Sequence, residues 1–220
     1  PVTGSSLVSH PGIDRISFTG GTVTGRQVMS DAGKQLTPCT MELGGKSANI
    51  IFASADYERA LDGALIGIFS NNGQQCLAGS RILVQEKIFD KFVEEFVQRT
   101  KKIKVGDPLN DKTEIGPIAS KQHMERILSF AENAQKEGDK VLVGGKRLSD
   151  QKTGFFLEPT AVLAADVITI SFFILLHFGY SIFHLLSISI LLRGMFLILL
   201  FKSSEKNLIN FVIKVLNSKI

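Results

Sequence analysis

A cysteine and a glutamate in this sequence each lie beside a glycine-containing turn. Cys76 lies in the stretch NNGQQCLAGS, after an apolar helical pattern, and Glu42 lies in MELGGKS, at the end of an apolar strand pattern. A cysteine acts as a nucleophile when solvent can reach it and when backbone N–H groups or positive potential stabilise its thiolate. A carboxylate at a strand end can act as a general base that activates water. The two residues could therefore form the core of an active site.

Taken singly, each of these residues has a simpler interpretation. A lone cysteine in a chain of this kind is more often a small buried residue, and Cys39 in the stretch LTPCTM keeps that interpretation. Glu42 alone is better explained as a solvated acid at a strand end, and Lys46 is most simply a surface lysine. Neither motif by itself establishes a function.

A third glycine-rich stretch lies nearer the N-terminus. FTGGTVTG places Gly20, Gly21 and Gly25 between a strand pattern and a helix pattern. Backbone N–H groups at a helix N-terminus bind phosphate, and glycines allow the phosphate to approach closely. The spacing differs from the dinucleotide pattern G-x-G-x-x-G, so an ordinary strand-to-helix turn remains open as the alternative.

The elements that must position these residues alternate between strand and helix, which predicts an α/β fold. Apolar residues at helical spacing and an N-cap aspartate, Asp56, indicate one of the helices. The predicted helices cover 22–34, 56–72, 87–103 and 121–138. The predicted strands cover 15–20, 38–45, 47–53, 80–85, 140–145 and 155–163.

Composition narrows the possible partners. The 220 residues carry a net charge of +4, but this excess comes from residues 167–220, and residues 1–166 are balanced. The basic character is therefore no sign of a nucleic-acid partner. Two cysteines make no disulfide framework, which favours a reducing compartment, the cytoplasm. The four histidines show no zinc-ligand spacing, so no metal site is expected.

The motifs together resemble the aldehyde dehydrogenase superfamily. FTGGTVTG, ELGGKSANIIF and NNGQQCLAGSR occur in the family's order, followed by VGDP, GP, VGG and GFFLEPT. The interval from Glu42 to Cys76 equals the family's interval between general base and nucleophile. The resemblance covers nearly all of residues 1–165. It implies part of a Rossmann-like cofactor domain over 1–43, a catalytic domain over 44–166 and an apolar tail outside the family over 167–220.

The resemblance also implies roles for particular residues. Cys76 would attack an aldehyde, forming a thiohemiacetal and then a thioester, and Glu42 would activate the water that releases the carboxylic acid. NAD or NADP would be the cofactor, and which of the two is open, as is the identity of the small aldehyde substrate. Gly21 stands where many members of the family have serine. The residues expected to line the cofactor are Thr19, Gly20, Gly21, Thr22, Gly25 and Leu43.

Several parts of the family pattern are not found. They include further cofactor and oxyanion contacts and the segment through which family members form homo-oligomers. We therefore expect this chain alone to reduce no NAD in the presence of an aldehyde. The alternative to an enzyme is an inactive fragment or pseudogene product, which could associate with a membrane through its tail.

Residues 167–220 admit two interpretations. Residues 167–192 contain no Asp, Glu, Lys or Arg, and this length is sufficient for a membrane span. His177 and His184 interrupt the run, however, which disfavours a span. The segment is rich in residues with A/T-rich codons and lacks Ala and Pro. We therefore favour a frame-shifted or intron-derived origin for it.

Overall fold

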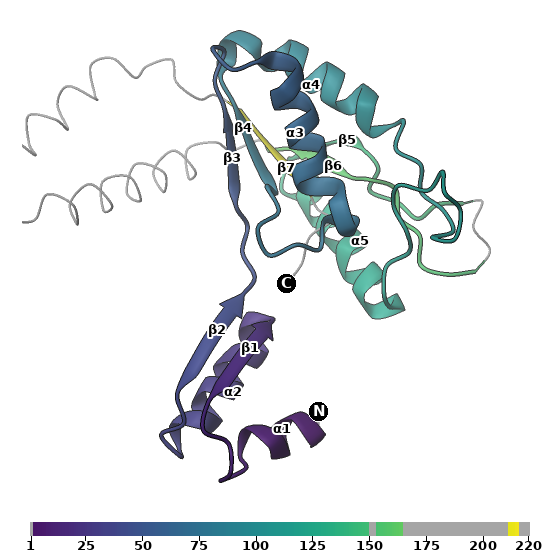
Figure 1. Cartoon of the computed structure of the whole chain (residues 1–220). Helices are drawn as coiled ribbons and strands as arrows, with labels where there is room; N and C mark the ends of the chain where they lie inside the picture. The colour runs from purple at the N-terminus through teal and green to yellow at the C-terminus, as the bar shows by residue number, and fades with distance from the viewer. Residues whose placement is uncertain (1, 150–152, 165–210, 216–220) are drawn as a thin grey trace, which may run out of the picture.

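The computed structural model describes residues 2–149, 153–164 and 211–215. The described strands form a two-stranded sheet and a five-stranded sheet. The segment between Leu43 and Ala48 joins the two sheets, as Figure 1 shows. The predicted α/β class is confirmed.

The smaller unit is a β–α–β arrangement. Its strands β1 (Ile16–Gly20) and β2 (Cys39–Leu43) are parallel, and α2 (Thr22–Gly33) connects them. Thr19 pairs with Glu42, and Gly20 pairs with Leu43. A short helix that the sequence did not predict, α1 (Val2–Val8), precedes β1 and has no buried residue. The carboxyl ends of β1 and β2 therefore lie side by side, next to the start of α2.

The larger sheet has the order β3-β4-β7-β6-β5. β3 and β4 are parallel, whereas β7 is antiparallel to both β4 and β6, and β5 is antiparallel to β6. The central strand, β7, is thus far in sequence from the other four strands of the sheet. The bounds are β3 (Ala48–Ile51), β4 (Arg81–Val84), β5 (Lys140–Val143), β6 (Ala161–Leu163) and β7 (Phe211–Val215).

One strand prediction is corrected. The strand predicted over 155–163 is formed only at its end, as β6; before it, Leu157 makes a single bridge to Arg147. Pro159 lies just before β6 and has no N–H for a strand ladder. The strands predicted on either side of Gly44 and Gly45 are β2 and β3, which belong to different sheets. The domain boundary at residue 43 stays a prediction.

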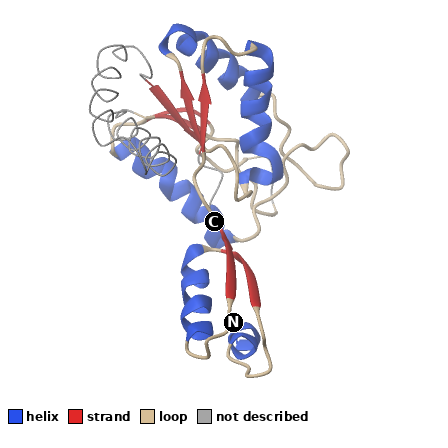
Figure 2. Ribbon diagram, turned by 60° about the vertical axis from the view of Figure 1, so that its left-hand side comes forward, coloured by secondary structure: helices blue, strands red, loops and turns tan. Residues whose placement is uncertain are grey.

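Three long helices cover the larger sheet on both faces. α3 (Tyr57–Phe69) and α4 (Glu86–Thr100) lie on one face, and α5 (Lys121–Lys136) lies on the other (Figures 1 and 2). Asp56 caps α3 as predicted, because its carboxylate accepts a hydrogen bond from the Arg59 N–H at 3.2 Å. The helix predicted over 56–72 ends earlier, at Phe69, and the 3₁₀ turn η1 (Ser70–Gly73) follows it.

Aromatic side chains from α3 and α4 fill the space between these helices and the sheet. Phe92 and Phe96 on α4 have no exposed surface. The Phe96 ring is stacked with that of Phe69 at a centroid distance of 6.1 Å, and the Phe92 ring meets the edge of Tyr57 at 6.2 Å. These contacts bury the apolar face of α4 against the core, as the spacing of its phenylalanines predicted.

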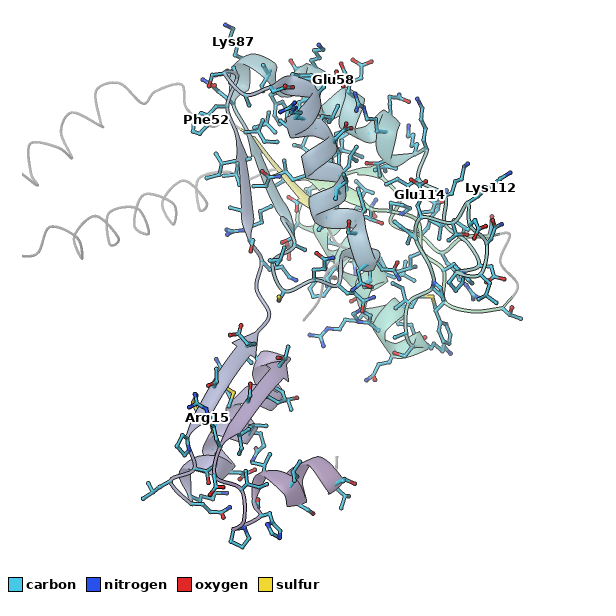
Figure 3. All side chains as sticks on the ribbon, in the orientation of Figure 1. Arg15, Phe52, Glu58, Lys87, Lys112 and Glu114 are labelled. Carbon is cyan, nitrogen blue, oxygen red and sulfur yellow. The ribbon has the colours of Figure 1, made fainter. Side chains whose placement is uncertain are left out.

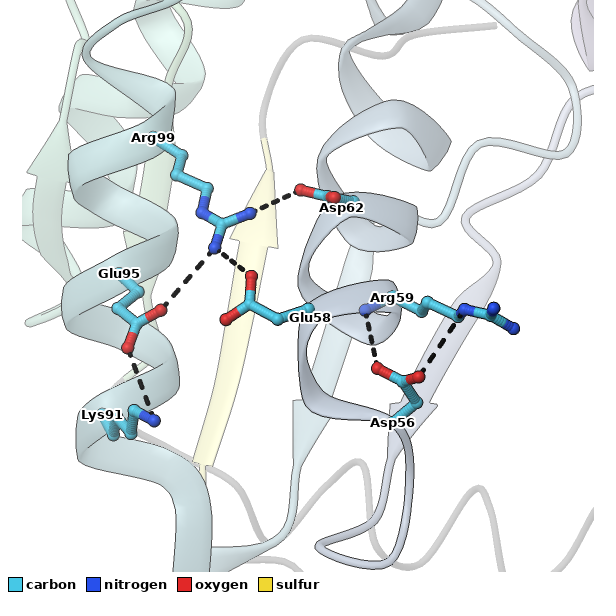
Figure 4. Close-up of polar contacts among 7 residues, drawn as sticks. All are labelled: Asp56, Glu58, Arg59, Asp62, Lys91, Glu95 and Arg99. Atoms are coloured by element: carbon cyan, nitrogen blue, oxygen red, sulfur yellow. Dashed lines mark hydrogen bonds and ion pairs between the residues drawn. The ribbon is translucent and has the colours of Figure 1, made fainter.

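Charged side chains join α3 and α4 at their exposed rim (Figure 4). The Arg99 guanidinium on α4 forms ion pairs with Glu58 and Asp62 on α3, and it lies 3.8 Å from Glu95. The hydrogen bond to Glu58 is the main cause of a raised pKa for Arg99. Burial is the main cause of a raised pKa for Tyr57, and the negative charge of Glu95 adds to it.

No helix within the described residues is long and apolar enough to cross a membrane. The uncharged run 167–192, for which a span was considered, lies outside the described residues. So does the rest of the predicted tail, except for β7.

We predict that removal of β7 separates the two halves of the larger sheet. A chain ending at Asn210 would lose the strand that joins β4 to β6 in the described sheet, whereas a chain ending at Val215 would keep it. In the shorter chain, hydrogen–deuterium exchange of the β4 and β6 amides should accelerate by about tenfold or more, because each lost hydrogen bond contributes about 1 kcal/mol. Equal protection in the two chains would contradict the role of β7.

We also predict that Phe96→Ala destabilises the fold strongly. Removal of a fully buried aromatic side chain leaves a cavity and lowers the free energy of unfolding by about 3–5 kcal/mol. Phe130→Ala is the matched control, because Phe130 on α5 is 43% exposed and should contribute much less. Urea denaturation measures both changes, and equal losses of stability would refute the placement of Phe96 in the core.

Candidate functional site

Cys76 lies in a turn between two buried elements. This turn, residues 70–80, is named the nucleophile turn after the role predicted for Cys76. It connects the end of α3, where Ile68 and Phe69 are buried, with β4. Cys76 itself is exposed, as a nucleophile requires. The simpler interpretation of Cys76 as a small buried residue is therefore wrong.

The turn begins with three consecutive residues in the left-handed region. The φ angles are 50° for Asn71, 56° for Asn72 and 71° for Gly73. Glycine and asparagine adopt this conformation more readily than other residues. The sequence Asn-Asn-Gly therefore ends α3 abruptly and redirects the chain so that Gly73 is buried while Cys76 is exposed.

Backbone hydrogen bonds fix the other end of the turn. The N–H of Gly79 donates to the carbonyl of Gly67 on α3 at 3.1 Å, and the N–H of Ala78 donates to Gln75 at 3.1 Å. A Cβ atom on Gly79 would lie 3.2 Å from the Cβ of Asn49 on β3, so the chain passes closely over that strand. Among the described residues, the N–H of Cys76 donates no hydrogen bond.

The segment between the two sheets lies against the nucleophile turn. The carbonyl oxygen of Cys76 lies 3.7 Å from the position that a Cβ on Gly45 would occupy. On the same segment, the Lys46 carbonyl accepts a hydrogen bond from Arg81 Nε at 2.9 Å. Glu42 precedes Gly45 by three residues, so the structure brings the backbone of the two predicted motifs together.

The side chains of Glu42 and Cys76 are not joined by a hydrogen bond among the described residues. Glu42 lies in β2 and is exposed. Its exposure does place the carboxylate within reach of water. The fold thus brings together two motifs that lie far apart in sequence, and both Glu42 and Cys76 are exposed.

The glycine-rich stretch forms the N-terminus of α2. Gly21 is the N-cap and makes no side-chain cap, and a Cβ there would meet nothing within 4 Å. The backbone hydrogen bonds of the helix begin with the one from the Gly25 N–H to the Gly21 carbonyl, at 2.9 Å. The first N–H groups of the helix therefore have no partner within it, and Thr22 carries the first of them. Such a terminus fits a phosphate group.

Two of the residues expected to line the cofactor pack against each other. Gly25 is buried, and a Cβ there would lie 2.6 Å from Leu43 Cδ2. Glycine at this position lets α2 approach β2 closely. Thr19, by contrast, is exposed, and a Cβ on Gly20 would lie 2.6 Å from the ring of Phe18. Contact of these residues with a cofactor stays a prediction.

One carboxylate of the smaller unit is held by neighbouring donors. Asp31 accepts hydrogen bonds from Gln27 Nε2 at 2.8 Å and Lys34 Nζ at 2.7 Å. These two hydrogen bonds lower the pKa of Asp31, and the bond from Gln27 has the larger effect. No group of three histidine, cysteine, aspartate or glutamate residues in the described ranges could hold a metal ion.

The sequence motifs did not reveal that the Asn72 side chain joins the nucleophile turn to a distant loop. Its side chain contacts Gly116 and Pro117, which lie more than 40 residues away in sequence. The available signal was the Asn-Asn-Gly run, which favours left-handed backbone, but this run does not indicate a distant partner.

Comparison with known proteins identifies relatives across the first three quarters of the chain. Residues 1–167 match the model of the aldehyde dehydrogenase family. A chloroplastic aminoaldehyde dehydrogenase of Arabidopsis thaliana is 45% identical over 166 residues, which are 76% of this chain and 33% of that protein. A 4-trimethylaminobutyraldehyde dehydrogenase of Danio rerio is 46% identical over 161 residues, 71% of this chain and 32% of that protein. The chain thus spans about a third of the length of these curated relatives.

Solved structures agree with this result. A betaine aldehyde dehydrogenase from Staphylococcus aureus, solved in complex with NAD⁺, has a TM-score of 0.69 and 46% identity, and the match covers 71% of this chain and 32% of that one. An aldehyde dehydrogenase from Bacillus cereus has a TM-score of 0.69 and 42% identity, with 72% and 32% covered.

We predict that Cys76 reacts with iodoacetamide faster than Cys39 in the folded chain. Cys76 is exposed, whereas Cys39 is half-buried and its Sγ lies 3.5 Å from the Thr37 carbonyl. A difference of about tenfold or more is expected, because alkylation needs an accessible thiolate. Peptide mass spectrometry measures both rates. In urea the two rates should converge, and equal rates in the folded chain would contradict the exposed turn.

Proposed function

This chain belongs to the aldehyde dehydrogenase family, and on that premise we propose that it carries the thiol and carboxylate steps of NAD(P)-dependent aldehyde oxidation. The observation that carries the proposal is the placement of Cys76. Its thiol is exposed, its N–H is unpaired among the described residues, and its carbonyl lies against Gly45 in the segment that follows Glu42.

Cys76 is the nucleophile. Its thiolate attacks the aldehyde carbon, so that a carbon–sulfur bond forms and the carbonyl π electrons move to the oxygen. The unpaired Cys76 N–H donates to this developing oxyanion, and it is pre-oriented because the turn is fixed at both ends. The product is a thiohemiacetal on the Cys76 sulfur.

The smaller unit supplies the cofactor contacts of this chain. The uncapped N-terminus of α2 fits the pyrophosphate, with Thr22 carrying the first helical N–H and Gly21 leaving room for close approach. Thr19 and Gly20 lie at the end of β1 beside this terminus, and Gly25 and Leu43 hold α2 against β2. When bound, NAD(P) supplies the two-electron acceptor that turns the Cys76 adduct into a thioester.

Glu42 is the general base. Its exposed carboxylate takes a proton from water, the water oxygen attacks the thioester carbon, and the carbon–sulfur bond breaks to return the Cys76 thiolate. The released product is a carboxylic acid. The position of Gly45 beside Cys76 supports this assignment, because it brings the Glu42 segment to the turn that bears the thioester.

The named relatives suggest which aldehydes to test. Aminoaldehyde, betaine aldehyde and 4-trimethylaminobutyraldehyde dehydrogenases all carry the name of an aldehyde with a nitrogen-containing group. We propose such an aldehyde as the substrate class. The alternative of an inactive product is not favoured by these similarities.

We predict that an activated acetyl ester acylates Cys76 and that Glu42 governs release of the acetyl group. In a Cys39→Ser background, where Cys76 is the remaining thiol, Cys76→Ala should abolish acylation. Glu42→Gln should leave acylation intact and slow deacylation by about 100-fold or more, because general-base catalysis contributes this much. Mass spectrometry of the intact chain follows both steps.

Glu125→Gln is the matched control for Glu42→Gln, because Glu125 is an exposed acid on α5. Its deacylation rate should equal that of the parent chain. Deacylation of Glu42→Gln at the parent rate would remove Glu42 from the proposal. Absence of acylation in the parent chain would overturn the proposed role of Cys76.

A further inference from the structure

One asparagine side chain joins the nucleophile turn to a distant loop. Asn72 Nδ2 donates to the Pro117 carbonyl at 3.0 Å, and the Gly116 N–H donates to Asn72 Oδ1 at 3.2 Å. The loop, residues 101–120, follows α4 and carries Lys112 and Glu114, which Figure 3 labels. A single amide thus uses both its donor and its acceptor on consecutive residues of one loop.

The backbone of Asn72 has an unfavourable conformation that these two hydrogen bonds can stabilise. With φ 56° and ψ 26°, Asn72 is in the left-handed region, which costs an L residue about 1–2 kcal/mol. Neighbouring Asn71 and Gly73 are in the same region, so the whole start of the turn departs from ordinary backbone. Such a conformation persists when surrounding contacts determine it, and the Asn72 side chain makes two of those contacts.

Buried side chains and a backbone hydrogen bond hold in place the part of the loop that Asn72 contacts. The Ile115 and Ile118 side chains on either side of Gly116 and Pro117 are buried, in two different hydrophobic clusters. The Ile118 N–H also donates to the Phe155 carbonyl at 2.8 Å. Asn72 therefore connects the turn to a segment that is fixed by packing on both sides.

We propose that Asn72 is a positioning residue for Cys76. It holds the start of the nucleophile turn in its left-handed conformation and thereby aims the Cys76 N–H and thiol at the reacting carbon. Asn72 lies four residues before Cys76 and acts through the backbone, without touching the substrate. The inference rests on the proposed function of Cys76.

Two substitutions separate the side-chain bonds from the backbone conformation. Asn72→Gly removes both hydrogen bonds but accepts the left-handed φ without strain. Asn72→Asp keeps the shape and the acceptor for the Gly116 N–H, but it loses the donor to Pro117 and places a carboxylate oxygen against that carbonyl. Asn133→Asp is the matched control, because Asn133 is exposed on α5 and makes no side-chain hydrogen bond within the described residues. All variants carry Cys39→Ser.

Two reactions of the Cys76 thiol distinguish positioning from folding. Acylation by an activated acetyl ester passes through an oxyanion and needs the oriented Cys76 N–H, whereas alkylation by iodoacetamide needs only an accessible thiolate. In both Asn72 variants we expect acylation to slow by about tenfold or more, since loss of an oxyanion donor has effects of this size or larger. Alkylation should change by less than about threefold, and Asn133→Asp should match the parent chain in both reactions.

Hydrogen–deuterium exchange gives a reading that needs no reaction at Cys76. The Gly116 amide loses its acceptor in Asn72→Gly, and the Gln74 and Ala78 amides belong to the turn itself. All three should exchange about tenfold faster in that variant, which corresponds to one hydrogen bond. Unchanged exchange at Gln74 and Ala78 would overturn the proposal.

The outcomes separate this inference from the function on which it rests. If the parent chain is alkylated but not acylated at Cys76, the proposed function fails, and exchange at Gln74 and Ala78 then decides whether Asn72 holds the turn. If the parent chain is acylated, unchanged acylation in both Asn72 variants overturns the inference. An equal fall of acylation and alkylation also overturns it, because loss of folding alone would have that effect.

Discussion

The burial of β4 is the constraint on which the position of the cysteine depends. Ile82, Leu83 and Val84 are 0–1% exposed, and the strand pairs with β3 on one side and β7 on the other. Burial of each such side chain contributes about 1.5–3 kcal/mol, so β4 has little freedom to shift. Since α3 ends in the buried Ile68 and Phe69, the nucleophile turn is held between two buried ends. A short turn with both ends fixed can present one exposed thiol in a defined direction.

This arrangement reconciles two opposing requirements. A nucleophile must reach solvent and substrate, but its orientation must be as reproducible as that of a core residue. The role proposed for Cys76 needs both, and the turn combines them. Unusual backbone is concentrated at residues 71–73, where asparagine and glycine tolerate it, and Asn72 is bonded to the loop at Gly116 and Pro117. Cys76 and Leu77 are exposed, while Gly73 before them and Ala78 after them are buried.

The two sheets contribute different parts of the site. The smaller unit holds Glu42 and the open N-terminus of α2, and the larger unit holds Cys76. The segment 44–47 connects them, and its contact with the nucleophile turn at Gly45 is what brings the carboxylate strand near the thiol turn. A Cβ at position 45 would be in ordinary van der Waals contact with the Cys76 carbonyl, so it is the backbone of this segment that lies against the turn.

The sequence by itself determined the local elements and the motifs. Phenylalanine spacing fixed the buried face of α4, Asp56 fixed the start of α3, and the ordered glycine, glutamate and cysteine motifs indicated the family that the comparisons then showed. Only the tertiary structure decided that β2 and β3 belong to different sheets, that β7 lies between β4 and β6, and that Asn72 bonds to Gly116 and Pro117. The physical reason is that periodicity and capping act over a few residues, whereas strand pairing and side-chain hydrogen bonds across the fold join groups far apart in sequence, for which a local pattern carries no signal.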